Sequence, residues 1–199
     1  MDKHSQKNGI IEGTIWKQLL IFFFPILVGT FFQQLYNTVD AVIVGQFAGK
    51  EALSSVGGSS SQIINFVVGF FTGLSAGATV IISQFYGAND ANKIHRALHT
   101  AYAFSIVGGI IAGIIGIALT VPVMKLMNTP EELMHDSAMY VMIYFGGLVF
   151  IFVYNMGSAI LRAIGDSKRP LYYLIICCFI NIVLDIVFVS VLKLGVLGV

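Results

Sequence analysis

Apolar residues fill five stretches of this sequence, each long enough for a helix that crosses a membrane. A bilayer core about 30 Å thick needs about 20 apolar residues in a helix. Turn-forming residues separate the stretches at 87–90, 128–130 and 165–170. The pattern predicts transmembrane helices over residues 15–48, 53–86, 95–127, 135–164 and 170–192. A further apolar segment begins at 195–199, so we expect a sixth helix and a longer protein beyond it.

The composition indicates that lipid surrounds these helices. Of the 199 residues, 57% are apolar and only 11% are charged, and the mean hydropathy is +0.87. A soluble domain carries about 25% charged residues. This low charge excludes a soluble enzyme, a disordered chain and a nucleic-acid-binding protein. We therefore predict an all-α, polytopic membrane protein.

The basic residues predict how the helices are oriented. Eight of them lie on one side of the predicted topology: Lys3, Lys7, Lys17, Lys93, Arg96, Arg162, Lys168 and Arg169. The three on the other side are Lys50, Lys125 and Lys193. Loops rich in Lys and Arg stay in the cytoplasm. We expect residues 1–14 to form a cytoplasmic N-terminal segment and residues 15–199 to form the transmembrane unit.

Two aspartates lie well inside the predicted spans. An aspartate at a helix centre costs about 2.5–3.5 kcal/mol to insert, so such residues usually face a cavity or a partner. Asp40 lies eight residues before Ala48, and Asp185 lies eight residues before Lys193. Both are thus about 12 Å from the outer ends of their helices. Because the first and fifth spans run in the same direction, we expect the two carboxylates to share one site.

Other polar residues accompany the aspartates at helical spacing. Asn181 precedes Asp185 by four residues and shares its face of the helix. The first span has a polar stripe ahead of Asp40, made by Gln33, Gln34 and Asn37. A polar stripe on a membrane helix lines water or another helix, so we predict that these three residues line a substrate cavity.

Three further residues of the spans have chemical roles in this interpretation. Pro25 removes one backbone hydrogen bond from the first span and permits a bend there. Tyr140 and Asn155 lie on the fourth span and need polar partners if they face inward.

The spacing of Cys177 and Cys178 indicates neither a disulfide framework nor a structural metal site.

Two clustered carboxylates in a medium of low dielectric repel each other, which favours binding of a proton or a small cation. Carboxylate and amide oxygens suit Na⁺, so Asp40, Asn181 and Asp185 are its candidate ligands. The alternative is a neutral, hydrogen-bonded aspartate that only holds two helices together.

Glycines recur at Gly69, Gly73 and Gly77 and at 108–116, and we expect them to allow neighbouring helices to pack closely.

Four segments resemble the multidrug and toxic compound extrusion (MATE) family of transporters, in the expected order. They are Leu35–Asp40 with Gly45, Gly77-Ala78 with Ser83–Ala88, Arg162–Ser167 with Pro170, and Asn181–Asp185. The resemblance covers the chain from about Ile15. Helix six is barely begun and the second lobe of the family is absent from the sequence.

This resemblance implies the N-terminal lobe of a twelve-helix, two-lobe antiporter in the cell inner membrane. Such proteins are not enzymes, need no cofactor, and export organic, often cationic xenobiotics against an inward flow of H⁺ or Na⁺. The family's cation or proton site then maps to Asp40, Asn181 and Asp185, with Tyr140 and Asn155 in the same neighbourhood. The missing C-terminal lobe is the implied partner.

Three other functions compete with efflux. A lipid-linked oligosaccharide flippase of the same superfamily needs a basic cavity, yet no span has Lys or Arg in its middle. An intramembrane aspartyl protease would use Asp40 and Asp185 as a dyad, but Val39 and Leu184 stand where its motifs need Tyr and Gly. A structural membrane subunit would leave the matched depth of the two aspartates as an accident.

Overall fold

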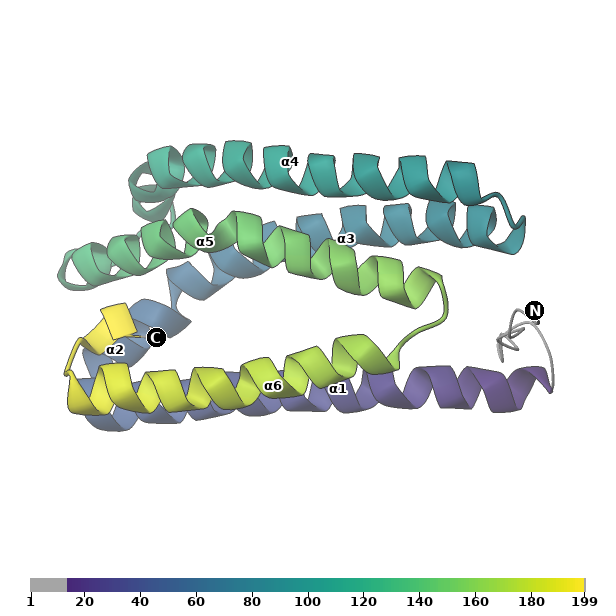
Figure 1. Cartoon of the computed structure of the whole chain (residues 1–199). Helices are drawn as coiled ribbons and strands as arrows, with labels where there is room; N and C mark the ends of the chain where they lie inside the picture. The colour runs from purple at the N-terminus through teal and green to yellow at the C-terminus, as the bar shows by residue number, and fades with distance from the viewer. Residues whose placement is uncertain (1–13, 199) are drawn as a thin grey trace.

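A computed structural model describes residues 14–198 of the chain (Figure 1). The cytoplasmic segment expected at 1–14 therefore lies almost entirely outside the described residues. Six α-helices form the described structure: α1 (Ile15–Ile43), α2 (Gly49–Gly57), α3 (Ser59–Gly87), α4 (Ala91–Leu126), α5 (Glu131–Ala163) and α6 (Lys168–Asp185). Three shorter segments are η1 (Val44–Ala48) and η2 (Ile186–Val191), which are π-helical, and η3 (Gly195–Gly198), which is a 3₁₀ helix.

Five helical spans are long and apolar enough to cross a membrane, and no strand occurs among residues 14–198. The predicted all-α, polytopic class is therefore confirmed. The short helix α2 was not predicted, because the expected spans leave only a short connection at residues 49–52 and assign the rest of this segment to the second span. The backbone breaks at Gly49, whose φ of 93° lies in the left-handed region that glycine tolerates. It breaks again at Gly58, so α3 begins at Ser59 rather than near residue 53.

The long helices form two groups that run roughly along one direction (Figure 1). Helices α3, α4 and α5 pack against one another around a core of Met124, Val141, Phe145, Leu148 and Phe152. Helices α1 and α6 lie side by side and parallel. The short helix α2 joins the groups at one end, where Ser137 on α5 donates a hydrogen bond to the carbonyl of Ser55 at 3.2 Å.

The two groups of glycines behave differently. A Cβ at Gly109 would lie 2.8 Å from Cα of Val149, and a Cβ at Gly113 would lie 2.8 Å from the carbonyl oxygen of Phe145. Glycine here lets α4 and α5 approach backbone to backbone, as predicted. At Gly69, Gly73 and Gly77 the Cβ positions have no neighbour within 4 Å among the described residues. The expected packing role is therefore not seen for that stripe.

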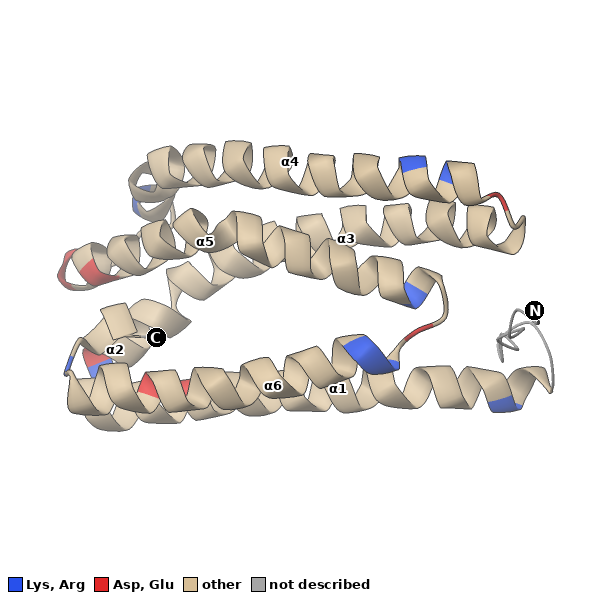
Figure 2. Cartoon of the chain, in the orientation of Figure 1, with Lys and Arg blue, Asp and Glu red and all other residues tan. Residues whose placement is uncertain are grey.

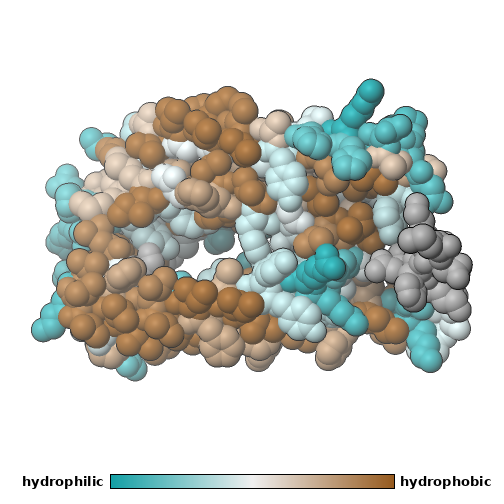
Figure 3. Space-filling view, in the orientation of Figure 1, coloured by the Kyte–Doolittle hydropathy of each residue, from teal (hydrophilic) through white to brown (hydrophobic). Residues whose placement is uncertain are grey.

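Charged and apolar residues separate along the bundle. Figure 2 shows Lys and Arg gathered toward the end of the bundle where α1 begins, on the ends of α4, α5 and α6 next to the α3–α4 and α5–α6 connections. Figure 3 shows an apolar band across the middle of the molecule, hydrophilic ends, and a hollow between the two groups of helices. This distribution matches a bilayer between two aqueous layers.

Candidate functional site

The structure brings the two intramembrane aspartates together. Asp40 on α1 and the last residue of α6, Asp185, interact through their carboxyl groups. Asp185 is 2% exposed, whereas Asp40 is partly buried. The contact follows from the parallel course of α1 and α6 and from the equal depth of the two residues. The two carboxyl groups are therefore neighbours, and their role as one ion site stays a prediction.

Asn181 completes a group of three oxygen-bearing side chains. Among the described residues, buried oxygens without a hydrogen-bond partner include Oδ1 of Asp40, Oδ1 of Asn181 and Oδ2 of Asp185. Buried polar atoms are normally hydrogen-bonded, so three unsatisfied acceptors on adjoining helices indicate a place for a positively charged ligand. Within residues 14–198 no group of three or more His, Cys, Asp or Glu side chains is placed to hold a metal ion. Two carboxylates and an amide suit H⁺ or Na⁺ rather than a transition metal.

Each aspartate is followed by a stretch of π-helix. The segment η1 begins at Val44, one turn after Asp40, and η2 begins at Ile186, directly after Asp185. Single π-helical turns are rare and often mark functional sites. The hydrophobic pattern gives no sign of them, because a wider helical turn needs no change in residue type.

A cavity of about 530 Å³ opens beside Asp40, between α1, α2, α3, α5 and α6. Five predicted site residues line it, namely Gln33, Asn37, Asp40, Tyr140 and Asn181. Four polar lining residues were missed from the sequence, namely Tyr36, Ser61, Asn65 and Tyr144. Tyr36 precedes Asp40 by four residues and so lies on the same face of α1. This spacing was enough to predict Tyr36 as a lining residue. Ser61 and Asn65 come from α3, which no pattern within α1 reveals.

Four predicted residues do not line this cavity, and one of them, Asp185, interacts with Asp40 from the end of α6. Asn155 is 15 residues from Tyr140 on α5, a separation of about 22 Å along a helix. The structure therefore does not place Asn155 beside Tyr140 at the aspartates. Gln34 does not line the cavity, and its side-chain oxygen accepts a hydrogen bond from Nδ2 of Asn37 at 3.3 Å. Pro25 is buried within α1, and the helix continues unbroken through it.

The cavity contains carboxylate, amide and phenol groups but no basic side chain. None of its lining residues within the described chain is Lys or Arg. These lining side chains therefore favour a cationic or neutral ligand over an anionic one. The ring faces of Tyr36, Tyr140 and Tyr144 add surfaces on which an aromatic or cationic guest can stack.

Comparisons with known proteins agree on one family. The sequence profile of the family described as MatE matches residues 25–187. The "Probable multidrug resistance protein YoeA" of Bacillus subtilis (strain 168) is 32% identical over 187 residues, which cover 94% of this chain and 39% of that protein.

Two solved structures, a MATE "in the straight conformation" and a MATE "in the bent conformation", match with TM-scores of 0.88 and 0.87. Each is 25% identical, and each match covers 98% of this chain and 43% of the other. The chain thus spans about two fifths of the length of these proteins.

Proposed function

This chain belongs to the MatE family, and from that membership we propose that it forms the N-terminal lobe of an antiporter for organic cations. The lobe is a multi-pass membrane unit with five long apolar helices. Its relatives include a probable multidrug resistance protein. In this proposal the substrate leaves the cell while H⁺ or Na⁺ enters, and a second lobe completes the transporter.

The observation that carries the proposal is the set of unsatisfied oxygens on Asp40, Asn181 and Asp185. A proton or Na⁺ bound among them would remove the repulsion between the carboxylates and hold α1 against α6. The empty site would leave one negative charge at the wall of the cavity, on Asp40, and a second beside it, on Asp185, and together these charges attract a cationic substrate. Ion and substrate then compete, and antiport requires such coupling between two ligands.

The proline in α1 supplies a place for this coupling to act. Pro25 lies 15 residues before Asp40 on the same helix, and its ring removes one backbone hydrogen bond. We propose that ion binding at Asp40 bends or straightens α1 near Pro25 and so changes the shape of the cavity. Two similar structures are described as a MATE in the straight and in the bent conformation, which supports a proposal that includes a conformational change.

The cavity argues against the competing functions. A flippase for lipid-linked oligosaccharides must bind pyrophosphate, whereas no basic side chain lines this cavity in the described chain. The two carboxylates interact, as a protease dyad would require, but the relatives of this chain include a probable multidrug resistance protein and this argues against an aspartyl protease.

The gathering of Lys and Arg at one end of the bundle supports a cytoplasmic N-terminus.

The test is transport by the full-length protein, whether that is these 199 residues or a longer chain. Membrane vesicles are loaded with a fluorescent cationic dye, and its movement is followed under an imposed pH or Na⁺ gradient. We expect Asp40→Asn and Asp185→Asn each to reduce gradient-driven movement to that of vesicles without the protein.

Asp136→Asn is the matched control, because Asp136 is an exposed acid near the start of α5. It should transport at the wild-type rate, and the effective gradient identifies the ion. Wild-type transport by either site variant, at equal protein levels, would show that the carboxylates do not couple transport.

A further inference from the structure

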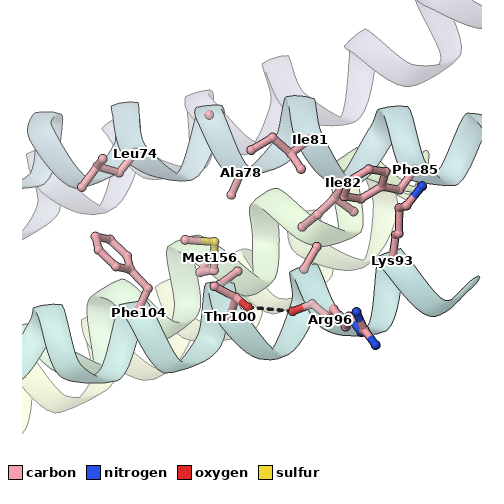
Figure 4. Close-up of a pocket in the computed structure, with 13 residues that line it drawn as sticks. Leu74, Ala78, Ile81, Ile82, Phe85, Lys93, Arg96, Thr100, Phe104 and Met156 are labelled. Atoms are coloured by element: carbon pink, nitrogen blue, oxygen red, sulfur yellow. Dashed lines mark hydrogen bonds between the residues drawn. The ribbon is translucent and has the colours of Figure 1, made fainter. Parts of the chain in front are cut away.

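A second cavity lies between α3 and α4, at the end of the bundle where basic residues gather. Figure 4 shows its walls, which are mostly apolar and include Leu74, Ala78, Ile81, Phe85 and Phe104. Its volume is about 620 Å³. It shares no lining residue with the cavity beside Asp40, so the proposed transport function does not account for it.

The cavity continues along the bundle as a groove. A third cavity of about 840 Å³ follows between α3, α4 and α5, and Leu74 and Phe104 line both. Its walls are also almost wholly apolar, with Phe66, Phe70 and Ile111 among them. At Gly77 a Cβ would meet nothing within 4 Å, so that wall is recessed. The joined cavities form one long apolar groove on the surface of the described chain.

Two cations stand at one end of this groove. Figure 4 shows Lys93 and Arg96 together at the end opposite Leu74 and Phe104. Lys93 forms a salt bridge with Asp90 at 3.0 Å, and its ammonium lies 5.8 Å from the ring centroid of Phe85. Arg96 has no salt bridge among the described residues. One positive charge is therefore uncompensated where the apolar groove begins.

If the midpoint of α4 is placed at the bilayer centre, the depth of these cations matches the phosphate layer of a membrane. Helix α4 has 36 residues, and a rise of 1.5 Å per residue places Arg96 about 19 Å and Lys93 about 23 Å from its midpoint. The hydrocarbon core extends about 15 Å from the bilayer centre, and the headgroups reach about 20–22 Å. Phe104 lies about 7 Å from the midpoint of α4, within the depth of acyl chains.

We propose that this groove binds an anionic phospholipid, with its phosphate on Arg96 and Lys93 and one acyl chain along α3 and α4 past Leu74. Charge complementarity selects this occupant, because a neighbouring apolar helix or a second protein copy would leave Arg96 without a counter-charge. A free phosphate would use the cations but not the groove. Juxtamembrane basic residues attract anionic lipids in the same way.

The experiment measures lipid binding to the full-length protein, purified in a neutral detergent. The probes are palmitoyl-oleoyl phosphatidylglycerol and phosphatidylcholine with the same chains, and native mass spectrometry counts the bound lipids. We expect phosphatidylglycerol to bind about tenfold more tightly. Lys93→Gln with Arg96→Gln should remove this preference.

Two matched controls separate the groove from general effects. Lys168→Gln with Arg169→Gln removes two charges from the same end of the bundle, outside the groove, and should keep the preference. Gly77→Leu fills the groove and should weaken both lipids. Gly73→Leu, one turn away with similarly open space and not lining the groove, should leave binding unchanged.

Three outcomes would overturn the proposal. The first is equal binding of the two lipids by the wild-type protein. The second is an equal loss of preference in the two charge variants, which would indicate attraction to the whole basic end. The third is the absence of bound lipid, as expected if another part of the full-length protein covers the groove. Elution of each variant as a single species confirms that it is folded.

Discussion

At the scale of single residues, burial of Asp40 and Asp185 is unfavourable for their charged forms. Each aspartate, like Asn181, has a buried oxygen that no donor in the described chain satisfies. An unsatisfied buried polar group costs about 1–3 kcal/mol, and more when it is charged. In the proposed function, a bound proton or Na⁺ relieves this cost, and ion binding and release thereby drive a change in helix packing.

Asp90 shows the usual behaviour of a carboxylate outside the membrane. Its side chain accepts a hydrogen bond from the backbone N–H of Lys93 at the start of α4. This bond and the Lys93 ammonium hold the pKa of Asp90 below its usual range. A lowered pKa in the folded state means that Asp90 stabilises the fold above a pH of about 4. The contribution is lost as the pH falls through the lowered value.

We therefore expect Asp90→Ala to lower the Tm at neutral pH, because the first turn of α4 loses its cap. Once the carboxyl group is protonated in both states, the difference from the wild type should shrink toward zero. Thermal unfolding in detergent, followed by circular dichroism between neutral and strongly acidic pH, measures this. A Tm difference that is independent of pH would contradict the capping role.

At the scale of elements, glycine has opposite consequences on α3 and α4. At Gly113 a Cβ would press on the backbone of α5, whereas at Gly73 it would meet nothing within 4 Å. Gly113→Ala should destabilise the protein by about 1–3 kcal/mol through overpacking. Gly73→Ala should leave stability unchanged or raise it by about 0.5–1 kcal/mol, because alanine restricts the unfolded chain. Unfolding midpoints of the two variants test this, and equal effects would contradict it.

The long helices were predictable because lipid imposes a simple rule on them. Twenty or so apolar residues must span the core, and Asn128 and Gly165 sit in turns between such runs. The break at Gly49 falls where the sequence predicts the first span to end, before Lys50 and Glu51, whereas the short helix α2 that follows it was not predicted. The π-helical segments η1 and η2 were also hidden, because they depend on how α1 and α6 pack.

At the scale of the whole molecule, helix direction decides which predicted site residues meet. Asp40 and Asp185 were expected to be close because the first and fifth spans are parallel, and they interact. Asn155 was grouped with Tyr140 by family resemblance alone, and their separation along α5 keeps it from the cavity. The contribution of Asn65 could not be predicted, because it requires the relative rotation of α1 and α3.

The lobe separates its chemistry into distinct places. Acidic and amide groups lie between the two groups of helices, whereas uncompensated basic charge lies at one end, beside an apolar groove. In the two proposals, a cation binds inside the lobe and an anionic headgroup binds at its edge. These two sites share no residue, so their tests are independent.

The most direct test of the central claim is ion binding at Asp40 and Asp185 themselves. Infrared difference spectroscopy of the purified protein follows the protonated carboxyl band while pH or Na⁺ concentration is changed. We predict a carboxyl band that responds to the coupling ion in the wild type and in Asp136→Asn. It should be absent in both Asp40→Asn and Asp185→Asn. A response that survives unchanged in either site variant would show that the two aspartates do not form the ion site.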